Sequence, residues 1–365
     1  SLLLNLATKS NEKPLKGFHG FFSNYKDYDE SHYANKATEL INGELFTLDI
    51  TSKDFSNNIE KIIYYLDFPT AGPGSFPQYM VSKLASEHLK VVIGGQGGDE
   101  IFGGYARYVI GYLEQCLLAA IDGSYKNGNY IVTLESIIPN LGILKEYKPL
   151  IKSFWSQGLF DSMDERYFSL IDRSKTLSNE INWNELDKST VFDNFKNIFN
   201  NKNNVKKEAY FDKMTHFDFK SLLPALLHVE DRMSMAHSLE VRVPFLGQTH
   251  VGASSDLPLD WKLSPEVEKA ALRAAADLTR LPKEIVNRPK LPAGRATSPT
   301  MIENLLDELH GHALQYANDF PQLAGMFNDQ PEISLGLRLF RSLHITDGGV
   351  GREQKDLMTL LEDVE

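Results

Sequence analysis

Residues 91–105 read Val-Val-Ile-Gly-Gly-Gln-Gly-Gly-Asp-Glu-Ile-Phe-Gly-Gly-Tyr, and this stretch constrains the fold more than any other. The apolar triplet 91–93 predicts the end of a buried parallel strand, after which glycines around Gln96 open the backbone and an acidic pair enters a helix. Main-chain N–H groups in such a loop approach an anion closely, and the helix N-terminus adds a favourable dipole. The stretch therefore predicts a phosphate-binding turn in which Asp99 or Glu100 holds Mg²⁺. The alternative is a glycine-rich turn in which Asp99 only caps the helix.

The pattern around this stretch is that of an α/β fold. Strands are predicted over 15–22, over 44–50 and up to Ile93, and helices over 1–9, 29–41, 52–66 and 78–89, with the proline-rich segment 69–77 as a loop beside the site. Strands alternating with crossover helices indicate a doubly wound parallel sheet whose ligands lie at the carboxyl ends of the strands. Most of the remaining chain has helical periodicity, so we expect an α/β part over 1–110 and a mainly helical part over 111–365. The Asn- and Lys-rich segment 182–207 is predicted to be a solvated loop.

Composition excludes several classes of protein. With 365 residues, 42% of them hydrophobic, the chain is long enough to bury a large core. Its net charge of −11 argues against general binding to nucleic acid or to acidic membrane surfaces. The sequence has neither an apolar run of roughly 18 residues nor the pattern of a signal peptide, so we expect a cytoplasmic protein. Cys116 stands alone on an apolar helical face, which predicts a buried structural thiol.

Two further segments carry charge in unusual settings. Residues 230–246 predict a helix followed by a short extended exit, and the charged residues within this otherwise core-like sequence should form internal ion pairs: Asp231, Arg232, Glu240 and Arg242. Residues 286–294 form a basic cluster in a proline-stiffened segment. Lys290, held by Pro289, would place a cation against a phosphoryl transition state, whereas the alternative is an exposed basic turn.

Taken together and in this order, the segments resemble the C-terminal synthetase domain of glutamine-dependent asparagine synthetases, which has the PP-loop ATP pyrophosphatase fold. The resemblance rests on Leu15-Lys-Gly-Phe18, Tyr28-Asp-Glu-Ser31, residues 90–105, Asp231-Arg-Met-Ser-Met-Ala236 through Leu246, Lys269 with Leu272-Arg273, and Asn287-Arg-Pro-Lys290. It implies a Rossmann-like doubly wound parallel sheet followed by a mostly helical lobe. It also implies adenylation of the aspartate side-chain carboxylate by ATP and Mg²⁺, with pyrophosphate leaving, and attack of ammonia on the β-aspartyl-AMP.

The resemblance also implies roles for particular residues. Gly20 falls where adenine is contacted, and the loop glycines Gly94, Gly95 and Gly97 fall where the nucleotide is held, the first two at its α-phosphate. Asp99 matches an acidic Mg²⁺ ligand, and Lys290 matches the lysine that stabilises charge during adenylation. The remaining catalytic candidates are Gln96, Glu230 and Asp231; whether Glu230 or Asp231 lines the path of ammonia stays open.

The chain also departs from the family pattern. The family's pyrophosphate loop, Ser-Gly-Gly-x-Asp-Ser, and its N-terminal glutaminase domain are not found in this sequence. We therefore expect a synthetase domain that is inactive on its own and has the glutaminase domain as a partner. A homodimer is also an expected form of the protein. Gln96 stands where many members carry Glu and β-lactam synthetases carry Tyr, and Gly247 stands where the family usually has Asp. Two alternatives follow: a β-lactam-synthetase-like or otherwise diverged amide ligase, and a non-catalytic relative that binds a partner.

Overall fold

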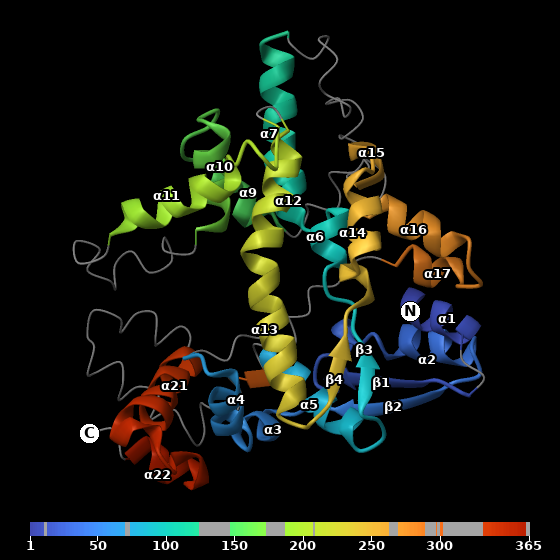
Figure 1. Ribbon diagram of the computed structural model, residues 1–365, viewed down its shortest axis with the longest axis vertical. Helices are drawn as coiled ribbons and strands as arrows, with labels where there is room; N and C mark the ends of the chain where they lie inside the picture. The colour runs from blue at the N-terminus through green and yellow to red at the C-terminus, as the bar shows by residue number, and fades with distance from the viewer. Residues whose placement is uncertain are drawn as a thin grey trace.

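The computed structural model (Figure 1) describes residues 1–10, 13–69, 74–123, 147–172, 187–206, 209–262, 269–288, 297, 300–301 and 331–362. Within these residues, the strands form two parallel pairs. β1 (Lys16–Phe21) pairs with β2 (Glu44–Asp49), and β3 (Val91–Ile93) pairs with β4 (Glu240–Arg242). The registers place Gly20 opposite Leu48 and Ile93 opposite Arg242. The α/β class is thus confirmed, as a mostly helical chain with small parallel sheets.

Helices cover both faces of the first strand pair. The helices in residues 2–86 are α1 (Leu2–Ala7), η1 (Thr8–Ser10), η2 (Lys26–Tyr28), α2 (Ser31–Glu39), α3 (Ser52–Ser56), α4 (Ile59–Leu66) and α5 (Ser75–Ser86). Gly17 faces the Thr38 side chain of α2, and Gly20 faces the Val81 side chain of α5. Because residues three apart on a strand point to opposite faces, α2 and α5 pack on opposite sides of β1.

Most of the remaining chain is helical. Its described elements are α6 (Gly98–Phe102), α7 (Ala106–Ile121), α9 (Lys148–Trp155), α10 (Met163–Ile171), α11 (Lys188–Phe199), α12 (Tyr210–Lys220), α13 (Leu222–Met235), η7 (Pro244–Leu246), α14 (Gln248–Ser255), α15 (Leu259–Lys262), α16 (Ala270–Asp277), α17 (Lys283–Val286), α21 (Pro331–Phe340), the π-helical turn η10 (Arg341–Ile345), η11 (Thr346–Gly349), η12 (Arg352–Gln354) and α22 (Leu357–Glu362).

The described residues form two large apolar cores. The helices that contribute to them lie toward opposite ends of α13 (Figure 1). One joins α4, α5 and the C-terminal helices and includes Ile62, Phe76 and Leu339. The other is rich in aromatic residues and joins α7, α10, α11 and α12. α13 packs against α4 and α5 at one end and follows α12 at the other. It also contacts β4, so the last turns of α13 lie beside the β3–β4 pair.

Buried charges in the aromatic core are paired. Glu114 and Arg166 form an ion pair with 2.6 Å between Oε2 and Nη2, and both side chains are almost fully buried. One oxygen of Asp218 accepts hydrogen bonds from Tyr108 (2.6 Å), Tyr167 (2.9 Å) and Arg107. Such pairing offsets the cost of removing these charges from water. Cys116 is buried here as predicted, and burial raises the pKa of its thiol to about 12.

Most predicted elements are confirmed, with three differences. The loop predicted over 182–207 is wrong for 188–199, which form α11 with Asp187 accepting hydrogen bonds from the N–H groups of Ser189 and Thr190. The helix predicted over 52–66 is two helices. The loop predicted over 69–77 ends early, because α5 begins at Ser75 and Pro77 lies in its first turn, where a missing N–H costs nothing. Across the described ranges, none of the helices combines the length and the apolar character that crossing a bilayer requires.

Candidate active site

The glycine-rich stretch forms the predicted strand, loop and helix. The prediction that the strand is buried is wrong, because Val91 and Ile93 are both about half exposed. The N–H of Gly94 donates a hydrogen bond to the carbonyl of Arg242 (2.8 Å), which extends the β3–β4 ladder by one residue. α6 then begins at Gly98, and its N-cap is Gly97, whose φ is +89°. The alternative in which Asp99 caps the helix is therefore wrong, because Asp99 lies inside the first turn. The loop thus stands at the carboxyl end of a parallel strand, where α/β folds bind ligands.

At two positions of the loop, the surrounding side chains leave no room for any residue larger than glycine. A Cβ atom at Gly94 would collide with Oε1 of Glu230 and lie 2.9 Å from the Val241 side chain. A Cβ at Gly97 would collide with Leu246, and the positive φ disfavours a side chain in any case. Around Gly95, by contrast, no atom of the described residues lies within 4 Å of the added Cβ, and the residue is exposed. In the described part of the chain, no contact accounts for glycine at position 95, and its exposed main chain is accessible to a ligand.

Glu230 is a buried charge in contact with this loop. It lies near the C-terminal end of α13, is only 6% exposed, and its Oε1 packs over Gly94. Its Oε2 is buried and has no hydrogen-bond partner among the described residues. Burial raises the pKa of this carboxyl from 4.5 to about 7. The side chain is therefore poised to exchange a proton near neutral pH.

The neighbouring charges lie at the surface. Asp231 is 3.8 Å from Arg232, and the Arg242 side chain is 2.9 Å from Glu240, with all four side chains at least half exposed. The prediction of internal ion pairs is therefore wrong for these residues. Since consecutive helical residues point about 100° apart, only Glu230 reaches the loop while Asp231 turns toward solvent.

Asp99 is held by a lysine from a distant part of the chain. Nζ of Lys269 lies 2.7 Å from Oδ1 of Asp99, and both side chains are about three-quarters buried. Lys269 is the N-cap of α16 and has left-handed backbone angles (φ 55°, ψ 47°). A Cβ at Gly104 would collide with both Asp99 and Lys269, so glycine is required there for the pair to form. The sequence placed Lys269 in a recognisable motif but indicated no partner for it.

Of the two acidic candidates for magnesium, Asp99 fits better. Glu100 is 2% exposed and accepts a hydrogen bond from the hydroxyl of Tyr105 (2.5 Å), while Arg107 stacks over the tyrosine ring at 3.9 Å. In the described ranges no group of three or more His, Cys, Asp or Glu side chains is placed to hold a metal ion. One carboxylate suits a magnesium ion that also binds substrate phosphates, whereas an ion held by the protein alone would bind weakly.

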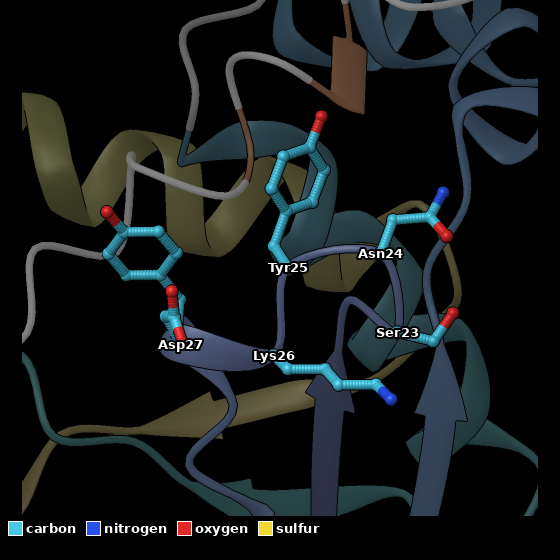
Figure 2. A pocket seen from close by; sticks show the side chains of 6 residues that line it. Ser23, Asn24, Tyr25, Lys26 and Asp27 are labelled. Carbon is cyan, nitrogen blue, oxygen red and sulfur yellow. The ribbon is translucent and has the colours of Figure 1, made fainter.

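The other predicted residues lie elsewhere. Gly20 lies near the carboxyl end of β1, where a Cβ would come within 2.7 Å of Ile50 and 2.9 Å of Val81. A pocket of about 330 Å³ opens in the loop that follows this strand, lined by residues 23–28 (Figure 2). Lys290 lies outside the described residues. Arg288, two residues before it, forms an ion pair with Glu30 and its carbonyl accepts a hydrogen bond from Arg273 (3.0 Å).

Comparisons with known proteins agree on one family. Residues 1–330 match the family described as asparagine synthase. The chain is 28% identical over 285 residues to asparagine synthetase (glutamine-hydrolysing) 1 of Bacillus subtilis, covering 72% of this chain and 40% of that protein. It is 27% identical over 299 residues to a Mycobacterium tuberculosis protein assigned as a glutamine-hydrolysing asparagine synthetase, covering 78% and 42%. The chain thus spans about two fifths of the length of these relatives. Because the family match covers most of its residues, the chain belongs to the asparagine synthase family.

Proposed function

We propose that this chain is the synthetase part of a glutamine-hydrolysing asparagine synthetase. It would activate the side-chain carboxylate of aspartate with ATP and then form the amide with ammonia. The observation that carries the proposal is the buried carboxylate of Glu230, which packs over Gly94 at the carboxyl end of β3 and whose Oε2 has no hydrogen-bond partner among the described residues. The names of the relatives support asparagine synthesis over a β-lactam-synthetase-like ligase or a non-catalytic role.

The loop residues would bind the nucleotide. Gly94, Gly95 and Gly97 bring main-chain N–H groups to the end of β3, where they suit the α-phosphate. Gly20 and the pocket at residues 23–28 both lie at the carboxyl end of β1, which supports placing the adenosine there. Asp99 would hold Mg²⁺ together with the phosphates, and the metal would supply positive charge against the leaving pyrophosphate.

Activation is needed because a carboxylate is a poor acyl donor. An oxygen of the aspartate side chain would attack the α-phosphorus of ATP, the bond from that phosphorus to the pyrophosphate oxygen would break, and aspartyl-AMP would form. Negative charge grows on the phosphates in this step. A fixed cation stabilises such charge more in the transition state than in the ground state, and we assign this role to Lys290.

Amide formation then requires a proton acceptor. The nitrogen lone pair of ammonia attacks the acyl carbon, AMP leaves with the bonding electrons, and the nitrogen must give up a proton. Glu230, with a pKa of about 7, is suited to accept it at neutral pH. Gln96 has a neutral amide and would orient the acyl group or ammonia. Asp231, which is exposed, would line the approach of ammonia rather than take the proton.

Several broader expectations belong to the same proposal. The apolar residues Val91 and Ile93 of β3 are both about half exposed, although parallel strands normally have both faces covered. This supports a larger, doubly wound sheet in the whole protein. We also propose the division into an α/β part over 1–110 and a helical part over 111–365, a glutaminase domain as the source of ammonia, a homodimer, and the cytoplasm as the place of action.

The proposal is tested by measuring the two half-reactions separately in the full-length protein. Glu230→Gln should keep aspartate-dependent pyrophosphate release within several-fold of wild type while lowering asparagine formation from ammonia by about a hundredfold, the usual minimum effect of losing a positioned base. Asp231→Asn is the matched control and should change asparagine formation by less than about fivefold. Wild-type rates of asparagine formation in Glu230→Gln would remove Glu230 from the mechanism.

A further inference from the structure

The ion pair between Asp99 and Lys269 bears on how magnesium reaches this site. The ammonium nitrogen of Lys269 lies 2.7 Å from Oδ1 of Asp99, the same carboxylate that the proposed function assigns to magnesium. A carboxylate oxygen this close to an ammonium group cannot also bind a divalent cation without repulsion between the two cations. The lysine must therefore move away, or lose its interaction with Asp99, before the metal can bind this oxygen.

The local backbone is shaped for this ion pair. Lys269 is one of few non-glycine residues in the described chain with a positive φ, and this angle is disfavoured for residues that carry a side chain. Gly104 leaves the space in which the Asp99 and Lys269 side chains meet, because a Cβ there would collide with both. Two separate segments, α6 with its following turn and the start of α16, thus contribute to one interaction.

Other ligands for a metal ion are scarce at this point. Glu100 is buried and bonded to Tyr105, and the described residues offer no cluster of three or more metal-binding side chains. Mg²⁺ commonly binds through one or two carboxylates together with substrate phosphates. A nucleotide therefore brings both things that the exchange needs: oxygen ligands for the metal and negative charge for the displaced ammonium.

We infer that Lys269 occupies Asp99 until nucleotide binds, so that magnesium enters with the phosphates and not before them. This inference rests on the proposed function and assigns Lys269 a positioning role at the same site. It implies positive coupling between nucleotide and metal: each raises the affinity of the protein for the other. A purely structural ion pair would stabilise the fold without affecting metal binding.

The experiment measures metal binding by the full chain without nucleotide. Mn²⁺ is titrated into the protein, and free Mn²⁺ is followed by electron paramagnetic resonance. Lys269→Met removes the ammonium and should bind Mn²⁺ about tenfold more tightly than wild type, whereas Lys269→Arg keeps the charge and should behave like wild type. Lys283→Met is the control, because Lys283 lies in α17, pairs with Asp277 at 2.8 Å and is mostly exposed. Equal Mn²⁺ affinities for wild type and a folded Lys269→Met would overturn the inference.

A second titration tests the coupling with α,β-methylene-ATP, whose α–β linkage cannot be cleaved. The analogue should raise the Mn²⁺ affinity of the wild-type site much more than that of Lys269→Met. An equal increase in both proteins would also contradict the inference. Failure of the wild type to bind the analogue at all would instead contradict the proposed function, and the titration without nucleotide would still decide the role of Lys269. Circular dichroism confirms that each variant is folded.

Discussion

Replacing Glu230 with Gln should make the protein more stable at alkaline pH, although it removes the proposed proton acceptor. The pKa of Glu230 is raised from 4.5 to about 7 by burial, so the folded state keeps a proton that the unfolded state has released. The free energy of unfolding must therefore fall as pH rises from about 4.5 to about 7 and stay level above that. The difference corresponds to at most about 3 kcal/mol, and screening by solvent at a site that borders an exposed loop reduces our estimate to about 1–2 kcal/mol.

Urea unfolding at pH 5 and pH 8, followed by the fluorescence of the three tryptophans, measures this effect. Glu230→Gln should exceed wild type by about 1–2 kcal/mol at pH 8 and by only a few tenths of a kcal/mol at pH 5, because the wild type loses most of this stability between the two pH values and Gln does not titrate. Glu240→Gln is the control, because Glu240 is exposed and paired with Arg242, and it should show no such gain at pH 8. If Glu230→Gln were less stable than wild type at pH 8, the carboxylate would have a partner, and the role of Glu230 as a poised base would fall.

Three further predictions concern the loop and its neighbours. Gly97→Ala should lower the free energy of unfolding in urea by about 1–3 kcal/mol, because Gly97 has a positive φ and a Cβ there would collide with Leu246. Gly95→Ala should change the free energy of unfolding by less than about 0.5 kcal/mol, and equal effects of the two substitutions would contradict the loop geometry. Lys290→Ala should lower pyrophosphate release by about two to four powers of ten with little change in aspartate affinity, and a loss within threefold would return Lys290 to a surface role. Gln96→Glu should leave adenylation largely intact and alter only the amide-forming rate, so unchanged asparagine formation would remove Gln96 from that step.

Local patterns in the sequence were sufficient to predict the strand, loop and helix around Gln96. An apolar triplet, glycines and an acidic pair act within one segment, so their conformation depends little on the rest of the chain. The same holds for β1 and β2, whose bounds agree with prediction to within a residue or two. For residues 188–199, the Asn- and Lys-rich composition led to the prediction of a loop, although the spacing of Phe192, Phe195 and Phe199 indicated a helix. These phenylalanines pack in the aromatic core and stabilise α11.

Contacts between distant segments could not be predicted in the same way. Glu230 over Gly94 and Lys269 beside Asp99 both depend on how α13 and α16 pack against the loop, which no single segment specifies. The sequence also treated Glu230 and Asp231 as equivalent candidates. Helix geometry separates them, since the orientation of α13 buries one carboxylate and exposes the other.

The most direct test of the account is a product balance in the full-length protein. Supplied with ATP, Mg²⁺, aspartate and ammonium at pH 8, it should release pyrophosphate and AMP and form asparagine in equal amounts, and omission of aspartate should abolish all three. Release of pyrophosphate that is independent of aspartate, or its complete absence, would contradict the assignment of this chain to aspartate activation.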